Sequence, residues 1–389
     1  MIVTVVSALW IASRLQLCNG TLVKPIPIFF VLGHLKIGGN ETIALQILQR
    51  IDRERFRPEV IVLAQDRDRI ADEFEKLGVP IRLCEFDPGK PWRFVWSFRK
   101  LVKLAKANIV FCFSFSTVHL WVHLGACLGG AKYRITRVGS WFDWNERDLR
   151  RLHMLGTFVC NKEVAVSEHV AKKLFESGRQ PARGITLIPN GCDVEGIFQK
   201  AVIGRQELEP DKHMIAMVSR MDNAKDHDTL LHAFALVRRE IPQAQLRLVG
   251  DGPRRPILEA LAQELGLRNS VEFTGMRRDI PQQLSDVDVY VFSTRTEGFP
   301  NALIEAMAAK LPIVASDIPS CREVLDDGKA GVLVSPGDFS RMAEAILSLL
   351  SDPSSCARAA ESAYKRVSEN YRIDNMVRAY ERLFTDGPI

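Results

Sequence analysis

The sequence has no closely spaced cysteine pair and no long hydrophobic run. Its eight cysteines are scattered singly, without the C-x-x-C spacing of zinc sites and redox motifs. We therefore interpret them as small apolar residues of a reduced, cytoplasmic protein. Residues 2–13 are mostly apolar, but they are fewer than the roughly 20 that a membrane span needs, and they lack the cationic start of a secretory signal. We treat residues 1–25 as an N-terminal extension whose role the sequence leaves open.

Acidic residues are missing from one long stretch of the N-terminal half. Between Asp87 and Asp143 there is no Asp or Glu, whereas the same stretch holds nine Lys and Arg residues. Residues 1–189 contain 28 Lys and Arg against 17 Asp and Glu, a net charge of +11, while residues 190–389 contain 24 against 30, a net charge of −6. A one-sided positive field of this kind favours an anionic partner such as lipid headgroups, a phosphorylated acceptor or nucleic acid.

Apolar runs of strand length alternate with amphipathic segments of helix length along nearly the whole chain. This alternation predicts an α/β fold with parallel sheets. Because 389 residues are too many for one core, we expect two doubly wound domains, at 26–190 and 191–370, followed by a helical segment at 371–389. The expected strands are 26–32, 60–63, 109–113, 133–138, 163–166 and 185–188, then 213–218, 245–249, 271–274, 289–293 and 312–315.

The most informative stretch is residues 293–305, which read STRTEGFPNALIE. A strand runs into a short loop here, and a helix begins around Pro300, where proline is tolerated. Backbone N–H groups between Gly298 and Asn301 would then lie at a helix N-terminus, which suits a diphosphate. Glu305 follows one turn later and is placed to accept both hydroxyls of a ribose, while Glu297 would face the other end of the same ligand.

Glu297 and Glu305 form an E-x7-E motif, and with the G-F-P-N filling between them the chain resembles the retaining GT-B glycosyltransferases of family 4, the glycosyl transferases group 1. The resemblance covers roughly residues 26–385 and implies the GT-B fold, two Rossmann-like domains facing across a cleft. Five further motifs match the family in order and spacing: Gly38-Gly39, Pro189-Asn190-Gly191, Ser219-Arg220 with Lys225, Gly250-Asp251-Gly252-Pro253, and Gly275-Met276-Arg277-Arg278.

The resemblance implies a retaining glycosyltransferase of the hexosyltransferase type, whose donor is a nucleotide-diphosphate sugar. UDP is the family's commonest carrier, so we expect a UDP-sugar. The catalytic residues would be Glu297, which binds the sugar, with Arg220 and Lys225, which stabilise the leaving diphosphate. The donor-binding residues would be Gly39, Arg220, Lys225, Gly250, Arg277, Glu297, Gly298, Phe299, Pro300, Asn301 and Glu305. The N-terminal domain would take the acceptor and the C-terminal domain the nucleotide sugar, with the helix at 371–389 crossing back to the N-terminal domain.

No cofactor is expected, because the family needs no metal ion. Asp286-Val287-Asp288 has the D-x-D pattern of metal-dependent glycosyltransferases but lies at the entrance to an expected strand, so we interpret it as a turn.

The sequence departs from the family's motifs at one place on the acceptor side. Many family members carry a histidine after a strand of the N-terminal domain, whereas residues 135–143 contain none and Gly139 or Ser140 occupies its position. Ser140, Asp143 and His119 are therefore acceptor-side candidates, and the identity of any acceptor-side base stays open. A catalytically silent nucleotide-sugar-binding protein and a nucleotide-sugar epimerase are the alternatives.

Residues 92–106 predict a helix with one apolar face and one cationic face that also carries two tryptophans. Exposed Trp beside Lys and Arg is typical of a helix at a membrane surface; the alternative is a solvated helix whose Trp residues touch a neighbouring loop. The membrane-surface candidates are Trp92, Trp96, Arg99, Lys103 and Lys106. We expect a lipid-linked or oligosaccharide acceptor, a role in surface polysaccharide or glycolipid biosynthesis, and a location at the inner face of the cytoplasmic membrane. Nucleic acid is not expected as a partner, because no nucleic-acid-binding module is recognisable.

Overall fold

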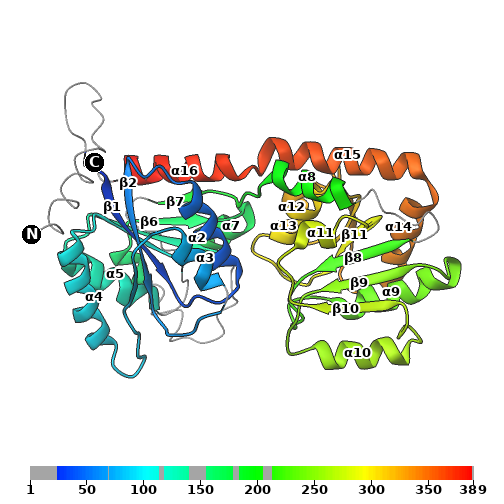
Figure 1. The fold of residues 1–389 in the computed structure, drawn as a ribbon, viewed down its shortest axis with the longest axis horizontal. Coiled ribbons are helices and arrows are strands. Elements are labelled where there is room, and N and C mark those ends of the chain that lie inside the picture. The colour runs from blue at the N-terminus through cyan, green and yellow to red at the C-terminus, as the bar shows by residue number, and fades with distance from the viewer. Residues whose placement is uncertain are drawn as a thin grey trace, which may run out of the picture. The chain divides into compact units, whose positions relative to one another are not determined.

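The chain folds into two compact units (Figure 1). The computed structural model describes residues 24–68, 70–113, 118–139, 155–177, 184–204 and 213–387. Unit 1 comprises the N-terminal part up to Ala165 together with Ala171–Leu187 and the C-terminal residues from Val377 on. Unit 2 comprises Val166–Val170 and Ile188–Met376. Each unit is built around one parallel sheet, as the alternation of the sequence predicts.

The sheet of unit 1 has seven strands in the order β3-β2-β1-β4-β5-β6-β7. The strands are β1 (Ile26–Leu32), β2 (Phe56–Val62), β3 (Ile81–Leu83), β4 (Ile109–Cys112), β5 (Tyr133–Val138), β6 (Lys162–Ala165) and β7 (Ile185–Leu187). The helices between them are α2 (Gly39–Arg50), α3 (Ile70–Lys76), α4 (Pro91–Ala105), α5 (Val118–Gly129) and α7 (Glu168–Glu176). β1 pairs in parallel with β2, from Ile26 opposite Phe56 to Leu32 opposite Val62, and with β4 on its other side.

Both faces of the unit 1 sheet are buried, which is why its central strands read as continuous apolar runs. On one face, Phe29 of β1 packs against Phe94 and Phe98 of α4. On the other face, the ring of Phe30 lies 6.2 Å from that of Phe384, which belongs to α16 (Ile373–Asp386). The C-terminal helix thus completes a core that begins with the first strand.

The sheet of unit 2 has six parallel strands in the order β10-β9-β8-β11-β12-β13. The strands are β8 (Met214–Val218), β9 (Gln245–Val249), β10 (Val271–Gly275), β11 (Val289–Phe292), β12 (Ile313–Ser316) and β13 (Val332–Val334). Its helices are α8 (Val194–Gly204), α9 (His227–Glu240), α10 (Arg255–Glu264), α11 (Ile280–Gln283), α12 (Asn301–Ala308), α13 (Pro319–Val324), α14 (Phe339–Ser351) and α15 (Pro353–Asn370).

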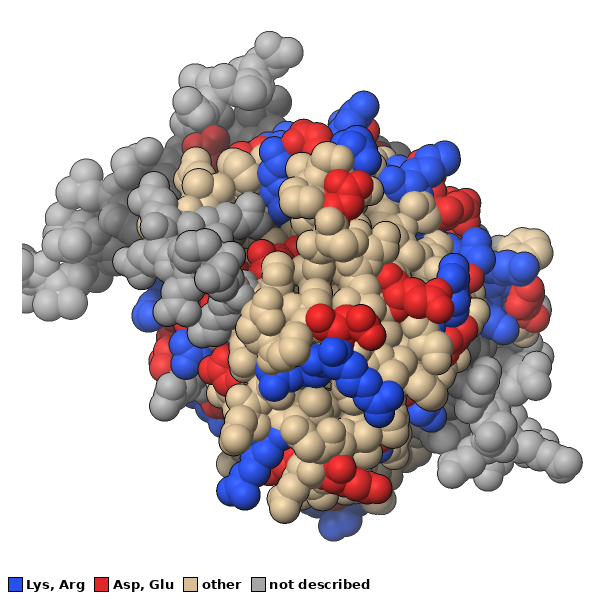
Figure 2. All heavy atoms as spheres, turned by 90° about the vertical axis from the view of Figure 1, so that its right-hand side faces the viewer, with Lys and Arg blue, Asp and Glu red and all other residues tan. Residues whose placement is uncertain are grey.

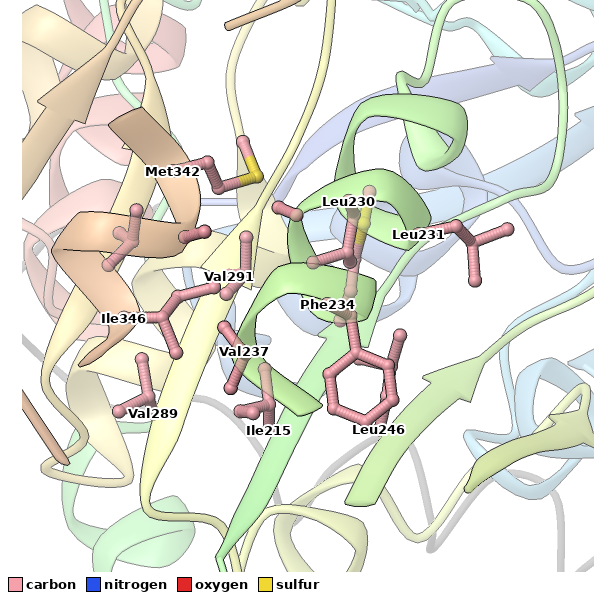
Figure 3. Close-up of a cluster of buried hydrophobic side chains, with 14 of the residues drawn as sticks. Ile215, Leu230, Leu231, Phe234, Val237, Leu246, Val289, Val291, Met342 and Ile346 are labelled. Atoms are coloured by element: carbon pink, nitrogen blue, oxygen red, sulfur yellow. The ribbon is translucent and has the colours of Figure 1, made fainter. Parts of the chain in front are cut away.

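The core of unit 2 is formed where α9 and α14 pack on the central strands (Figure 3). Phe234 of α9 is fully buried among aliphatic side chains from β8, β9 and β11. Ile346 of α14 and Val289 of β11 belong to the same cluster. Burying a side chain of this size contributes about 1.5–3 kcal/mol to stability, so this cluster holds the strand ends, and the loops that leave them, in fixed positions.

The strand order reverses between β1 and β4 in unit 1 and between β8 and β11 in unit 2. At such a point the loops after two adjacent strands lead away in opposite directions, and a crevice opens at the carboxyl ends of the strands. In unit 2 these two loops carry the motif residues Arg220, Lys225 and Glu297. The topology therefore brings together residues that are about 70 positions apart in the sequence.

Candidate active site

The loops that follow β8 and β11 are hydrogen-bonded to each other. Lys225 in the first loop and Thr294 in the second form an antiparallel bridge. The Thr294 hydroxyl donates to the carbonyl of Ala224 over 3.0 Å. Because of this bridge, Lys225 and Glu297 lie side by side in unit 2.

Lys225 and Glu297 form an ion pair between Nζ and Oε2. Their side chains are only 12% and 24% exposed, so the interaction is weakly screened by water. The Lys225 ammonium also lies 4.9 Å from the centroid of the Phe292 ring, which places the cation over the end of β11. A cation and a carboxylate fixed in this way can neutralise an anionic leaving group and accept hydrogen bonds from sugar hydroxyls.

Glu305 lies one helical turn into α12 and is partly buried. Burial raises the pKa of its carboxyl to about 7. A ligand hydroxyl that donates to this carboxylate would favour its ionised form and so oppose the effect of burial.

The start of α12 is held by two contacts that the sequence alone does not indicate. The Ser167 hydroxyl donates to the carbonyl of Gly298 over 2.7 Å. The Asn190 amide donates to the side-chain oxygen of Asn301 over 2.7 Å, which gives the Pro189-Asn190-Gly191 motif a structural role.

Phe299 is buried against Tyr371, with ring centroids 5.6 Å apart. Phe299 is a predicted donor-binding residue, but because its ring is buried only its backbone is available to a ligand.

The glycine-rich turn after β9 needs glycine for two physical reasons. Gly250 has a φ of +133°, and a Cβ at this position would collide with the carbonyl of Ser219. A Cβ at Gly252 would collide with the backbone of Met221. The turn thus packs directly against the loop that carries Arg220.

The two predicted arginines of the donor site are exposed. Arg220 is 73% exposed, and its Nε lies 3.6 Å from the carboxylate of Asp222. The guanidinium of Arg277 makes two hydrogen bonds, of 2.9 and 2.6 Å, to Asp279 in its own turn. Arg220 is free to reach a ligand, whereas Arg277 would have to leave Asp279 to do so.

On the acceptor side, Gly39 begins α2, and the next residue, Asn40, contacts two strand ends. Its amide donates to the Phe113 carbonyl over 2.8 Å, and its oxygen accepts from Arg137 over 2.7 Å. His119 is only 1% exposed and packs under Gly156. The candidates Ser140 and Asp143 lie outside the described residues.

The acidic pair of the D-x-D pattern has structural partners. Asp286 accepts hydrogen bonds of 2.5 and 2.9 Å from Arg247 of β9, and Asp288 accepts from the backbone N–H of Met214 over 2.8 Å. Within the described ranges, no group of three or more His, Cys, Asp or Glu side chains is arranged to hold a metal ion.

Two family models match the chain, one for each half. Glycosyltransferase Family 4 matches residues 37–195, and Glycosyl transferases group 1 matches residues 199–366. The chain belongs to the family 4 glycosyltransferases. Glu297 of the E-x7-E motif, which indicates this family in the sequence, is the residue that the structure pairs with Lys225.

Similar proteins agree with this assignment. The chain is 28% identical over 258 residues to the lipopolysaccharide core biosynthesis glycosyltransferase LpsE of Rhizobium meliloti, an alignment that covers 66% of this chain and 71% of LpsE. It is also 28% identical over 216 residues to a GDP-mannose-dependent α-(1-6)-phosphatidylinositol monomannoside mannosyltransferase of Mycobacterium tuberculosis, covering 52% of this chain and 56% of the relative. The crystal structure of Anabaena Alr3699/HepE in complex with UDP and glucose has a TM-score of 0.81 at 19% identity, and the match covers 93% of this chain and 100% of that one. This likeness confirms the GT-B fold.

Proposed function

We propose that this glycosyltransferase transfers a sugar, with retention of anomeric configuration, from a nucleotide-diphosphate sugar to a lipid-linked or glycan acceptor. The product would belong to a surface polysaccharide or glycolipid. The observation that carries the proposal is the Lys225–Glu297 ion pair in the loops after β8 and β11, together with Glu305 one helical turn into α12, the helix that follows Glu297 in the chain. The relatives support it by their names, which describe lipopolysaccharide core biosynthesis and mannosylation of a phosphatidylinositol glycolipid.

The proposed mechanism assigns one task to each of these groups. The N-terminus of α12 and the exposed Arg220 would bind the diphosphate. Lys225 would stabilise the charge that develops on the leaving phosphate, which is the interaction that usually contributes most to catalysis. Glu297 would accept hydrogen bonds from the sugar, and Glu305 from the ribose. For retention, the acceptor hydroxyl would attack from the face that the diphosphate leaves, and a phosphate oxygen would take its proton.

UDP is the proposed carrier, and nucleotide binding is the first test. A ligand present at about a hundredfold excess over its Kd raises the free energy of unfolding by about 2.7 kcal/mol. Thermal unfolding would be measured with UDP, GDP, ADP and CMP for the wild type, for Glu305→Ala, and for a control, Glu264→Ala, at an exposed position of the same unit. We expect one diphosphate to stabilise the wild type and the control, but not Glu305→Ala.

If no nucleotide stabilises the folded wild type, the proposed donor site is wrong. The two alternatives are separated by product analysis with the matching sugar nucleotide. An epimerase would release free sugar without an acceptor, and a silent binding protein would bind the nucleotide without turnover in either the wild type or Glu297→Ala.

We also propose that α4 places the protein on an anionic membrane surface. Pro91 begins this helix, and Phe94, Phe98 and Val102 face the core. The opposite face exposes Trp92 to 58% and Trp96 to 53%.

The candidates on this helix have different surroundings. The Trp92 ring meets that of Trp121 edge-on at 5.3 Å, so this tryptophan does touch a neighbouring element. Arg99 lies over the Trp96 ring at 5.3 Å, whereas Lys103 and Lys106 are exposed. These cations and tryptophans together fit a surface of anionic headgroups.

The charge pattern of α4 differs from that of the face of unit 2 that Figure 2 presents. On that face, acidic and basic side chains are interspersed (Figure 2), whereas neither α4 nor α5 carries an acidic residue. In the part of the chain that the structure describes, no helix combines the length and the hydrophobicity that crossing a bilayer requires.

Co-sedimentation with phosphatidylcholine vesicles, with and without phosphatidylglycerol, tests this surface. We expect binding only to the anionic vesicles, weakening as salt rises because exposed charges are screened. A Trp96→Ser, Lys103→Glu variant should lose binding, and the control Arg341→Glu, at a 71% exposed position of unit 2, should keep it. Equal binding by all three proteins would contradict the role of α4.

A further inference from the structure

Asp226 follows Lys225 directly and is 1% exposed. Its carboxylate accepts hydrogen bonds of 3.2 and 2.8 Å from the guanidinium of Arg295. It also accepts from the Thr229 hydroxyl over 2.8 Å and from the backbone N–H of Gly337 over 3.2 Å. One buried carboxylate therefore joins three segments: the loop after β8, the loop after β11 and the loop before α14.

The backbone beside Asp226 reinforces this junction. The Asp226 N–H donates to the Ser293 carbonyl over 3.1 Å, and the Ser293 hydroxyl donates back to the Asp226 carbonyl over 2.8 Å. On the other side of Lys225, the N–H of Arg295 donates to the Ala224 carbonyl over 2.9 Å. Lys225 is thus held on both sides by the segment that carries Glu297.

The identity of the partner indicates why a charge is buried here. A buried carboxylate is costly unless its oxygens are fully hydrogen-bonded, and here the charged partner, Arg295, lies two residues before Glu297. The loop that carries Lys225 has no regular secondary structure of its own. Its position relative to Glu297 therefore depends on these hydrogen bonds and on the contact of Lys225 with Phe292.

We propose that Asp226 is a positioning residue that, through Arg295, holds the Lys225 ammonium in register with Glu297 for the transfer step. The inference rests on the proposed function of Lys225 and Glu297. Groups that act on a transition state lose much of their effect when displaced by about 1 Å, which can cost about a hundredfold in rate. We call the hydrogen bonds of Asp226 with Arg295, Thr229 and Gly337 the Asp226 clamp. The clamp would act on kcat, because the proposed binding groups for the diphosphate and the ribose are α12 and Glu305.

Two variants weaken the clamp, and a third variant serves as a matched control. Asp226→Asn keeps the size of the side chain but replaces one accepting oxygen by a donor, so it cannot satisfy both Arg295 and the Thr229–Gly337 side. Arg295→Ala removes a partner that is itself 58% exposed, so this variant should fold. Asp286→Asn breaks the pair with Arg247 in the same unit, before β11 begins.

The first readout is independent of any donor. Amine-reactive labelling of Lys225, followed by mass spectrometry, reports how firmly the ammonium is held against Glu297. We expect labelling several times faster than in the wild type for Asp226→Asn and Arg295→Ala, and unchanged labelling for Asp286→Asn. Unchanged labelling in both clamp variants would overturn the inference.

The second readout is turnover, measured as diphosphate release from UDP-glucose, UDP-N-acetylglucosamine, GDP-mannose or ADP-glucose, whichever the wild type uses fastest. In Asp226→Asn we expect kcat to fall at least about tenfold, while the Kd of the matching diphosphate stays within about threefold of the wild-type value. In a Lys225→Ala background the same substitution should have no further effect on kcat, because residues that act as a unit are not additive.

An equal fall in kcat with and without Lys225 would contradict the inference, because Asp226 would then act on general stability alone. If Lys225→Ala itself leaves kcat unchanged, or if the wild type turns over no donor, the proposed function fails instead. The labelling experiment would still decide whether the clamp exists.

Discussion

Glu163 of β6 makes the stability of unit 1 depend on pH in an unusual direction. Its side chain is 1% exposed, and neither carboxylate oxygen has a hydrogen-bond partner among the described residues. Burial raises the pKa of this carboxyl from 4.5 to about 8. The folded state therefore binds the Glu163 proton more tightly than the unfolded state does.

The sign and the size of the effect follow from this difference in pKa. A raised pKa in the folded state gives extra stability that is fully present below about pH 4.5 and is lost as the pH rises through about 8. At about 1.4 kcal/mol per pKa unit, the interval from 4.5 to about 8 corresponds to a loss of about 5 kcal/mol. Glu305, whose pKa is raised to about 7, shifts stability in the same direction.

Glu163→Gln isolates the contribution of this one group, because glutamine has nearly the shape of the protonated acid and does not titrate. We expect the variant and the wild type to have similar urea midpoints at pH 5, and the variant to be more stable by several kcal/mol at pH 8.5. Glu59→Gln is the control, because Glu59 is also buried but is paired with Arg82 over 2.9 Å. It should lower stability at pH 8.5. Parallel pH profiles of stability for the wild type and Glu163→Gln would mean that folding does not raise the pKa of Glu163.

Three further predictions concern packing and backbone geometry. Gly250→Ala should weaken diphosphate binding and cost at least about 2 kcal/mol of stability. The residue has a φ of +133°, and its Cβ would collide with the Ser219 carbonyl. Calorimetric titration with the stabilising diphosphate would measure the loss of binding. Phe234→Ala should lower the free energy of unfolding by about 3–5 kcal/mol by leaving a cavity under α9, and an unchanged urea midpoint would contradict the described core. Gly139→Ala should cost about 1–3 kcal/mol, because its Cβ would lie 3.0 Å from the Asn40 oxygen and 3.1 Å from the Arg137 guanidinium. Unchanged urea unfolding would mean that these two side chains yield to the methyl group and keep their hydrogen bond.

The fold class and most of the strands are predictable from the sequence alone. β1 (26–32), β5 (133–138) and β9 (245–249) have the bounds that the sequence indicates. β1 is a continuous apolar run, whereas β5 and β9 are recognised because apolar residues recur among their polar ones. The sequence does not predict β3 and β13, because each has three residues and is partly exposed, with Leu83 at 48% and Val332 at 38%. Strands of three residues carry little hydrophobic signal, so some are recognised and others are not; the equally short edge strand β7 is predicted, at 185–188.

The sequence also determined the family, because its motifs depend on local chemistry. Each motif is recognisable within a short segment of the sequence. Examples are a glycine at a positive φ, a proline at a helix start and two glutamates eight positions apart. This local information is enough to indicate Glu297, Glu305, Lys225 and Arg220 as site residues. Their assigned roles stay predictions until the variants described above are measured.

The contacts between groups that are far apart in the sequence are known only from the three-dimensional structure. Ser167 contacts Gly298 131 residues further along the chain, and Asp226 binds Arg295 69 residues away. No local pattern encodes such pairs, because they depend on which strands become neighbours in the sheet. The pKa of Glu163 depends on tertiary structure for the same reason: a carboxyl is desolvated only when distant segments of the chain close around it.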